Sequence, residues 1–475
     1  MDHPFQRCHL AAALAALFIV SASGTAGEQS FLPSMLPFAN PTGIAATFAT
    51  AGKVDLTGPF FQSLGTNGRA CVSCHQASTG WTITPANVQA RFDATDGTDP
   101  IFRTNDGSNS PAADVSTLEA RRAAYTMLLS KGLIRVGIGI PQNAEFALIS
   151  VDDPYGHASA GELSLFRRPL PATNLKFLST IMWDGRETFK DPASQDCILG
   201  TTNCFVSLHF NLVDQSNSAT MGHAQAAQPL TVEQREAIVT FEMGLFTAQV
   251  FDDEADELTA RQALGGPQYL SQQNFYFGVN DVVSGDYRTG ALFNPIVFKL
   301  YDAWNTLDRG GDASRNEARR AVARGETLFN SKLFLITGVK GLNDDLGVPE
   351  LKGTCTTCHD TPTSGNHSIP APLDIGLTDA SRRTPDLPLY TLRHNLPPFE
   401  TIQTTDPGRA LITGKWKDIG RFKGPILRAL ATRAPYFHNG SAQDLHEAVD
   451  FYDQRFGIGF TDEEKDDLVA FLSTL

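Results

Sequence analysis

The sequence of 475 residues has little positive charge, and this scarcity excludes two classes of partner. Its 38 Lys and Arg residues are outnumbered by 52 Asp and Glu residues, which leaves a net charge of -14 and a pI near 5.2. A nucleic-acid binder, or a protein held at an anionic membrane surface, needs a cationic surface. We therefore expect neither kind of partner, whereas a basic protein partner is electrostatically reasonable.

Long hydrophobic runs are also scarce. No segment has the roughly 18 uninterrupted apolar residues of a membrane-spanning helix, so we expect no membrane insertion. The apolar stretch Leu10–Val20 follows Arg7 and precedes small residues that end at Ala26. This order of basic, apolar and small residues is typical of a secretory signal peptide. The sequence thus predicts a signal peptide over residues 1–26 and, in a bacterium, export to the periplasm.

Cysteine is rare, but four of the seven cysteines form two copies of one motif. The motif is Cys-x-x-Cys-His, at Cys71–His75 and again at Cys355–His359. In c-type cytochromes the two thiols attach haem and the histidine binds its iron. A thioredoxin-like dithiol and half of a zinc site are the competing interpretations. Chance gives on the order of 0.002 such matches at this composition, so two matches predict two covalently bound haem c groups, held by Cys71, Cys74, His75, Cys355, Cys358 and His359.

Two of the remaining cysteines, Cys197 and Cys204, lie close together in sequence. An even pair in an oxidising compartment predicts a local disulfide, to which we assign no catalytic role.

Weakly repeated patterns surround the two motifs. Gly58–Phe61 precedes the first motif and Gly325–Phe329 precedes the second, and each is interpreted as a helix that leads into the attachment loop. Thr231 and Thr461 each precede early acidic residues and a spaced apolar stripe, which predicts a capped closing helix in each half. The sequence therefore predicts a mainly α fold, with two tandem cytochrome c-like haem domains and long irregular insertions.

These patterns also predict the domain boundaries. We expect an N-terminal haem domain over residues 27–255, an interdomain connection over 256–314 and a C-terminal haem domain over 315–475. Residues 79–164 are rich in Gly, Asp, Asn and Pro, which predicts a largely irregular excursion with one helix near Ser116–Lys131. A second polar excursion runs from His367 to Gly414.

Two further segments carry a resemblance to a known superfamily. They are Trp183-Asp184-Gly185-Arg186-Glu187 and the run from Phe422-Lys423-Gly424-Pro425 through Leu427-Arg428 to Ala434-Pro435-Tyr436-Phe437-His438-Asn439-Gly440-Ser441. Together with the haem motifs, they resemble the bacterial dihaem cytochrome c peroxidase superfamily, which includes the MauG proteins. The resemblance implies two haem domains that face each other. It also implies reduction of hydrogen peroxide with electrons from a small redox protein or another donor, or peroxide-driven oxidation of a protein. We add a Ca²⁺ ion between the domains to the expected cofactors.

The resemblance assigns roles to two aromatic residues. None of the six methionines follows His359, so the second haem cannot receive a methionine ligand from its own domain. Aligning the helix that begins near Leu445 places Tyr452 where peroxidases have methionine and MauG proteins have tyrosine, so Tyr452 is the expected axial ligand. From the residues alone, a core aromatic is the favoured interpretation of Tyr452. Trp183 matches the tryptophan that lies between the haems, and packing is its alternative role.

A peroxidase also needs a group that moves a proton between the two peroxide oxygens. In the family this group is a glutamate downstream of the tryptophan, and the matching segment here places Gln225 at that position. Glutamine does not exchange a proton near neutral pH, whereas His223 does. His223 and Gln225 are therefore the candidate catalytic residues beside Trp183, and a solvated helix-end residue is the alternative for His223.

Three functions stay open at this point. The expected activity is that of an exported, MauG-like dihaem peroxidase. A rubber-oxygenase-like dihaem protein that activates dioxygen also suits the long insertions and the missing glutamate. A dihaem electron carrier without catalytic chemistry is the third possibility.

Overall fold

The computed structural model describes residues 30–188, 208–308 and 312–475. The predicted signal peptide and the predicted Cys197–Cys204 disulfide lie outside these residues. Across the described ranges, no helix combines the length and the apolar character needed to cross a membrane.

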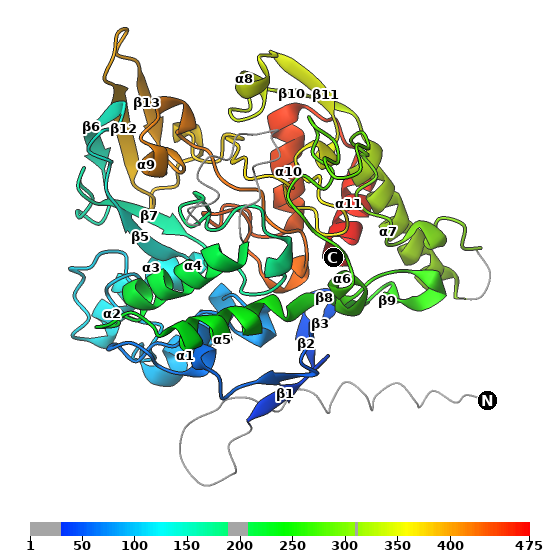
Figure 1. Cartoon of the computed structure of the whole chain (residues 1–475), viewed down its shortest axis with the longest axis horizontal. Coiled ribbons are helices and arrows are strands. Elements are labelled where there is room, and N and C mark those ends of the chain that lie inside the picture. Colours follow the sequence, from blue (N-terminus) through cyan, green and yellow to red (C-terminus); the bar gives the residue numbers. More distant parts are fainter. Residues whose placement is uncertain (1–29, 189–207, 309–311) are drawn as a thin grey trace, which may run out of the picture.

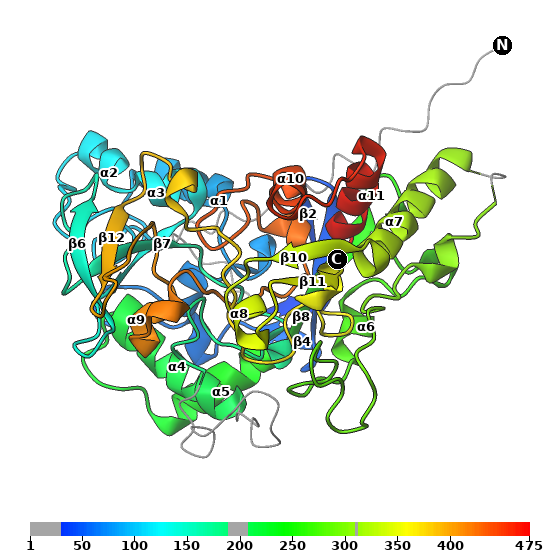
Figure 2. The ribbon, with the colours of Figure 1, turned by 90° about the horizontal axis from the view of Figure 1, so that it is seen from above.

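The helices are α1 (Pro85–Thr95), α2 (Leu118–Ala124), α3 (Thr126–Lys131), α4 (Leu208–His223), α5 (Val232–Met243), α6 (Pro267–Ser271), α7 (Ala313–Ser331), α8 (Asn343–Leu346), α9 (Ala410–Thr413), α10 (Leu445–Phe456) and α11 (Asp462–Ser473). The strands are β1 (Phe31–Pro33), β2 (Pro37–Asn40), β3 (Gly43–Ala49), β4 (Lys53–Asp55), β5 (Ile134–Ile138), β6 (Phe146–Asp152), β7 (Leu163–Arg167), β8 (Leu245–Asp252), β9 (Asp256–Glu257), β10 (Phe334–Thr337), β11 (Glu350–Gly353), β12 (Leu389–His394) and β13 (Thr401–Thr404). Helices α7 and α11 lie toward one end of the molecule, strands β6 and β12 lie at the other, and α10 lies between them (Figures 1 and 2).

The closing helices predicted in both halves are present, with the predicted caps. Helix α5 begins after Thr231, whose hydroxyl accepts from the Gln234 amide while the Gln234 side chain accepts from the Thr231 amide. Helix α11 begins after Thr461 with the same reciprocal pair to Glu464. Each box satisfies backbone donors that a helix start leaves unpaired, so local sequence is enough to place these ends.

The helix predicted before the second motif is also present, as α7, and it packs against α11. Gly325 makes this close approach possible, because a Cβ atom there would lie 1.9 Å from the Asp467 carbonyl oxygen of α11. Arg324 and Asp467 add an ion pair of 2.7 Å beside the contact. The corresponding prediction in the first half was wrong, since Gly58–Phe61 leads into only a short 3-10 turn at Pro59–Phe61.

The expectation of a mainly α fold holds only in part. Helices, 3-10 turns included, contain 33% of the described residues, and strands with isolated bridges contain 18%. A four-stranded sheet in the order β2-β3-β8-β9 extends from the end of α5, and Phe48 of β3 pairs with Phe246 of β8. The two central strands, β3 and β8, are far apart in the sequence, so their pairing left no local signal.

The two excursions predicted to be irregular form structure together. Strand β6 of the first excursion pairs with β12 of the second, giving a sheet in the order β13-β12-β6. The buried hydroxyl of Tyr390 donates to the Ser164 carbonyl at 2.7 Å and accepts from the Ser164 amide at 2.9 Å, which fastens the sheet to β7. The helix predicted near Ser116–Lys131 is split into α2 and α3 at Tyr125, where the Asn109 side chain bonds to the backbone of Met127 and Ala123.

Candidate functional site

Both Cys-x-x-Cys-His motifs fold in the same way. Each starts as a 3-10 turn, Cys71–Ser73 in the first motif and Cys355–Thr357 in the second. His75 Nδ1 lies 3.0 Å from the Trp81 carbonyl, and His359 Nδ1 lies 2.6 Å from the Gly365 carbonyl. A protonated Nδ1 that donates to a carbonyl leaves Nε2 as the free nitrogen, which is the usual arrangement of an iron-binding histidine.

Each motif opens into a cavity of its own. The cavity that contains Cys71, Cys74 and His75 has a volume of about 190 Å³, and the one that contains Cys355 and His359 has a volume of about 210 Å³. Their walls are mainly apolar, as a porphyrin requires. Burial lowers the pKa of both histidines to about 4, which keeps them neutral and able to act as ligands near pH 7.

A basic cluster lies in the wall that the two cavities share, and it supports the fit to haem. Arg168, Lys423 and Arg433 line both cavities, and none forms an ion pair with a carboxylate in the described part of the chain. Burial lowers the pKa of Lys423 to about 7 and that of Arg168 to about 9. Buried cations need counter-charges, and the propionate groups of haem supply them. We call these three residues the basic wall.

The competing interpretations of the motifs gain no support from their surroundings. A reactive dithiol needs a lowered thiol pKa, but burial raises the pKa of Cys71, Cys355 and Cys358 to about 12. A zinc site needs four ligands, and within the described residues no third cysteine, histidine or acidic ligand groups with either thiol pair. Haem attachment therefore accounts best for both motifs.

Trp183 lies at the junction of the two cavities and lines both of them. Its indole Nε1 donates to the Arg168 carbonyl at 2.8 Å, and its own carbonyl accepts from the Lys423 amide at 2.9 Å. Its ring centroid lies 6.2 Å from that of His438 in a T-shaped contact. These hydrogen bonds fix the backbone and the ring of Trp183 between Arg168 and Lys423 of the basic wall.

A buried charge network holds the turn after Trp183. Asp184 pairs with Arg167 at 2.5 Å and with Arg186 at 3.0 Å, and Arg167 also pairs with Asp406 at 2.7 Å. Burial alone would raise the pKa of Asp184, but the two guanidinium groups outweigh it and lower the pKa to about 2. Gly185 has φ +73, and a Cβ atom there would lie 2.7 Å from Arg409 Nη1, so the turn requires glycine.

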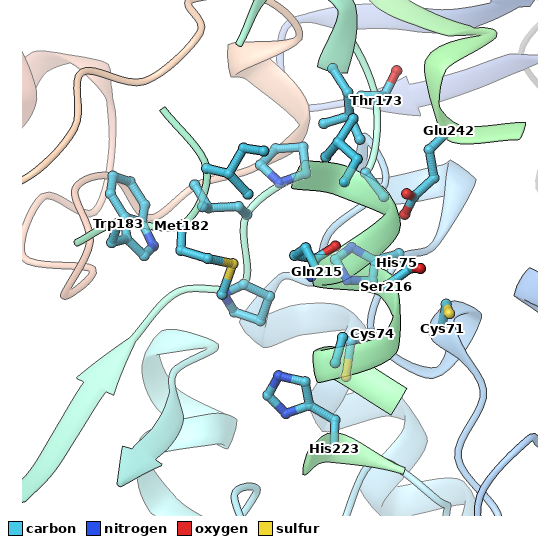
Figure 3. Close-up of a pocket in the computed structure, with 18 of the residues that line it drawn as sticks. Cys71, Cys74, His75, Thr173, Met182, Trp183, Gln215, Ser216, His223 and Glu242 are labelled. Carbon is cyan, nitrogen blue, oxygen red and sulfur yellow. The ribbon is translucent and has the colours of Figure 1, made fainter. Parts of the chain in front are cut away.

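His223 ends helix α4 and lines the first cavity (Figure 3). Its Nδ1 lies 2.5 Å from Asp106 Oδ2, and the other oxygen of Asp106 pairs with Arg69. Burial would raise the pKa of Asp106, but the hydrogen bond and charge of His223, together with Arg69, lower it. Asp106 comes from the first excursion, so this excursion supplies a partner that orients His223.

Gln225 lies outside the first cavity. It is exposed, and its side-chain oxygen lies 3.4 Å from Asn67 Nδ2. Its main chain turns with φ +53 after the end of α4, which separates it from the residues that line the cavity. Of the two candidate proton-transfer groups, the structure brings only His223 to the cavity.

A third cavity, of about 410 Å³, adjoins the first haem cavity. Its lining is more polar than that of either haem cavity, so we call it the polar cavity. His223, Asp106, Met182, Arg186 and Gln215 line both the polar cavity and the first haem cavity. Met182 has φ +65, a left-handed conformation that costs a non-glycine residue free energy.

Besides Asp106, sequence reasoning missed a second buried acid in the first cavity. Glu242 of α5 is 8% exposed, and its Oε2 has no hydrogen-bond partner among the described residues. Burial raises its pKa to about 8. Figure 3 shows Glu242 and Cys71 on the side of the cavity opposite Met182 and Trp183. Its position four residues after Ile238, on the predicted apolar stripe, was the signal that could have identified it.

Tyr452 of α10 lines the second cavity, together with Leu445, Ala448 and Val449 of the same helical face. The predicted stripe therefore faces the cavity. The Tyr452 hydroxyl makes no hydrogen bond to any other described residue, and its ring packs against Phe437, Phe451 and Phe456. Burial, with the neighbouring Cys358 and Cys355, raises the pKa of this phenol, so the site by itself favours the protonated form.

Comparison with known proteins relates the chain to named peroxidases. It is 29% identical over 234 residues to the cytochrome-c peroxidase IdrP1 of Pseudomonas sp. strain SCT, a match that covers 44% of this chain and 54% of that protein. It is 33% identical over 134 residues to IdrP2 of Denitromonas iodatirespirans, covering 26% and 36% of the two chains. A third match, to the cytochrome c551 peroxidase of Nitrosomonas europaea, is 38% identical over 80 residues and covers 16% and 24%.

The matched part thus spans about half of the first of these relatives and less of the others. No family model matches the chain. Among solved structures, a MauG-like protein associated with microbial copper homeostasis aligns over 96% of this chain and 95% of its own, with a TM-score of 0.37 and 17% identity. The peroxidase matches confirm the predicted resemblance: parts of the chain are similar to bacterial cytochrome c peroxidases.

Proposed function

We propose that the chain is an exported, periplasmic dihaem c-type peroxidase that reduces hydrogen peroxide with electrons from a protein or organic donor. The names of its relatives support the reaction class. Cys71, Cys74 and His75 would hold one haem, and Cys355, Cys358, His359 and Tyr452 would hold the other. When bound, haem supplies an iron that reacts with peroxide and stores oxidising equivalents.

The observation that carries the proposal is the asymmetry between the two haem cavities. The polar cavity of about 410 Å³ shares His223, Asp106 and Met182 with the first haem cavity, and it shares no lining residue with the second. A small polar substrate such as peroxide therefore has a polar approach to the first site. The second site, closed by the apolar face of α10, suits electron storage.

His223 is the residue that handles protons in this scheme. Peroxide reduction consumes two electrons and two protons per molecule and yields two molecules of water, so one oxygen must lose a proton and the leaving oxygen must gain one. Asp106 accepts from Nδ1 and so presents Nε2 as the atom that takes up and returns the proton. Arg69 pairs with Asp106 and keeps this carboxylate ionised and in place.

Trp183 is the residue that connects the two sites. It lines both cavities, and its hydrogen bonds to Arg168 and Lys423 fix it between them. An aromatic ring in this position shortens the path for electrons between the second site and the first. The basic wall lines both cavities and would supply positive charge to the propionate groups of bound haem.

The test is steady-state consumption of hydrogen peroxide by the holoprotein, with a reduced small cytochrome as donor. His223→Ala should lower kcat by about 10²- to 10⁴-fold, the usual contribution of a positioned acid–base group. His209→Ala is the matched control, because His209 lies on the same helix but is exposed and pairs with Glu236. Asp106→Asn should lower kcat less and shift its pH profile, since it alters the orientation of His223 rather than removing it.

Three results would contradict the proposal. Equal rates in His223→Ala and the wild type would remove His223 from the reaction. Reduction and reoxidation of both haems without peroxide consumption would indicate an electron carrier. Oxygen uptake with a polymer or aromatic substrate, in the absence of peroxide, would indicate an oxygenase.

A further inference from the structure

A second group of potential ligands lies beside the second haem cavity, which one of its members, His367, also lines. It consists of Asp281 from the interdomain connection and of Asp360 and His367, which follow the motif. One potential ligand atom from each lies within 4.8 Å of the other two. All three residues are buried, with exposures of 2%, 0% and 6% respectively. We call them the acidic triad.

The hydrogen bonds of the triad leave one buried oxygen unused. Asp281 Oδ1 accepts from the Val283 amide, the Ser284 amide and the Ser284 hydroxyl, at 3.1, 2.6 and 2.7 Å. Asp281 Oδ2 is buried and has no partner among the described residues. A buried carboxylate oxygen without a donor is costly, so this atom points to a ligand that the protein itself does not supply.

The charges of the triad lead to the same conclusion. Its two carboxylates are buried, and the described part of the chain places no Lys or Arg in an ion pair with either of them. His367 Nδ1 lies 3.5 Å from Asp360 Oδ2 and 3.1 Å from the Cys358 carbonyl, and this imidazole is the one basic side chain that the described residues place beside either carboxylate. A divalent cation would supply the missing positive partner.

The site is held in place before any ion binds. The Gly278 amide donates to the Ser368 carbonyl at 3.0 Å, and Asn280 Nδ2 donates to the Asp360 carbonyl at 3.0 Å. Both oxygens of Asp360 accept from Ser368, at 2.6 Å from the amide and 3.1 Å from the hydroxyl. Because these bonds already align the connection with the C-terminal domain, little ordering remains to oppose binding.

We propose that Asp281, Asp360 and His367 bind a divalent transition-metal cation of the Zn²⁺ or Mn²⁺ class. The combination of carboxylate oxygens with an imidazole selects this class, because Ca²⁺ and Mg²⁺ prefer oxygen ligands alone. The ion fastens the interdomain connection to the segment after the second motif. The Ser179 hydroxyl of the N-terminal half donates to the His367 carbonyl at 2.6 Å, so His367 also connects the metal site to the N-terminal haem domain.

The test measures metal content in the full-length holoprotein, with iron as the internal standard for haem. After purification without chelator, we expect about one zinc or manganese ion per chain in the wild type. The number of these ions per chain should be at least tenfold lower in Asp281→Asn. Asp302→Asn is the matched control, because Asp302 is exposed and lies in the same interdomain connection. Its metal content should equal that of the wild type.

A second measurement avoids dependence on the folding of the variant. Wild-type protein stripped with a chelator should bind added Zn²⁺ or Mn²⁺ saturably, and its thermal unfolding temperature should rise with the metal concentration. Stripped protein that binds neither ion would overturn the proposal. Full retention of the metal by Asp281→Asn would also overturn the proposal. Stoichiometric Ca²⁺ in place of a transition metal would overturn the assigned class of cation. None of these measurements depends on peroxidase activity, so the two proposals can fail separately.

Discussion

Replacing Glu242 with glutamine should flatten the dependence of the protein's stability on pH between about pH 5 and about pH 8. Burial raises the pKa of Glu242 from its ordinary 4.5 to about 8 in the folded chain. Between these two values the unfolded chain has lost the proton while the folded chain keeps it. The folded state therefore binds more protons, and the free energy of unfolding falls as the pH rises.

The size of the effect follows from the width of this window. Each pH unit within it lowers the free energy of unfolding by about 1.4 kcal/mol, so the loss between pH 5 and pH 8 amounts to about 4 kcal/mol. Below about pH 4.5 both states are protonated, and well above pH 8 both are ionised, so the contribution is flat outside the window. Glutamine has a similar shape and no charge to lose.

The assay is denaturant unfolding of the holoprotein at four or five pH values, followed by circular dichroism. The wild type should lose stability relative to Glu242→Gln as the pH rises, with the two similar near pH 5. Glu233→Gln, an exposed change on the same helix, should follow the wild type at every pH. Parallel curves for the wild type and Glu242→Gln would refute the reasoning, because they would mean that Glu242 is ionised in the folded protein throughout.

Two further predictions concern other charged and aromatic groups. Tyr452→Phe should change the absorption spectrum of the second haem, and Tyr452→Met should raise the reduction potential of that haem by roughly 100 mV. The control is Tyr436→Phe, which removes a hydroxyl that bonds to the Leu430 carbonyl. An unchanged spectrum in Tyr452→Phe would leave Tyr452 as a core aromatic. Asp184, whose pKa falls from 3.8 to about 2 on folding, should contribute about 2 kcal/mol of stability that is present above about pH 4 and lost as the pH falls to 2. Acid titration of Asp184→Asn by denaturant unfolding checks this, and a variant that loses as much stability as the wild type would contradict it.

Local chemistry explains which parts of the fold and site could be predicted. The haem motifs, the caps at Thr231 and Thr461 and the apolar face that ends at Tyr452 all depend on residues within a dozen positions of each other. Local sequence is enough to predict such structures, because a helix or an attachment loop makes the same local contacts in every protein that contains it.

The parts that could not be predicted depend on distant segments. Asp106 lies among many similar residues of a polar excursion, and only the fold brings it to His223. Lys423 forms no ion pair with any acidic residue that the structure describes, and only the fold shows that it lines both cavities. Nothing in the sequence of β6 or β12 indicates that the two strands pair. Their sheet therefore lies where two irregular stretches were expected.

That sheet sets an order of events during synthesis. Leu148 of β6 pairs with Leu392 of β12, about 240 residues further along the chain, so the pairing waits until most of the protein has been made. The segment that contributes Lys423, Ile426 and Arg433 to the first cavity is made later still. Cys71 and Cys74 therefore emerge into an unfinished cavity, which leaves their thiols accessible for haem attachment. Under the proposed function, the protein would fold around its first haem, and the second half of the chain would complete the walls of the cavity that holds it.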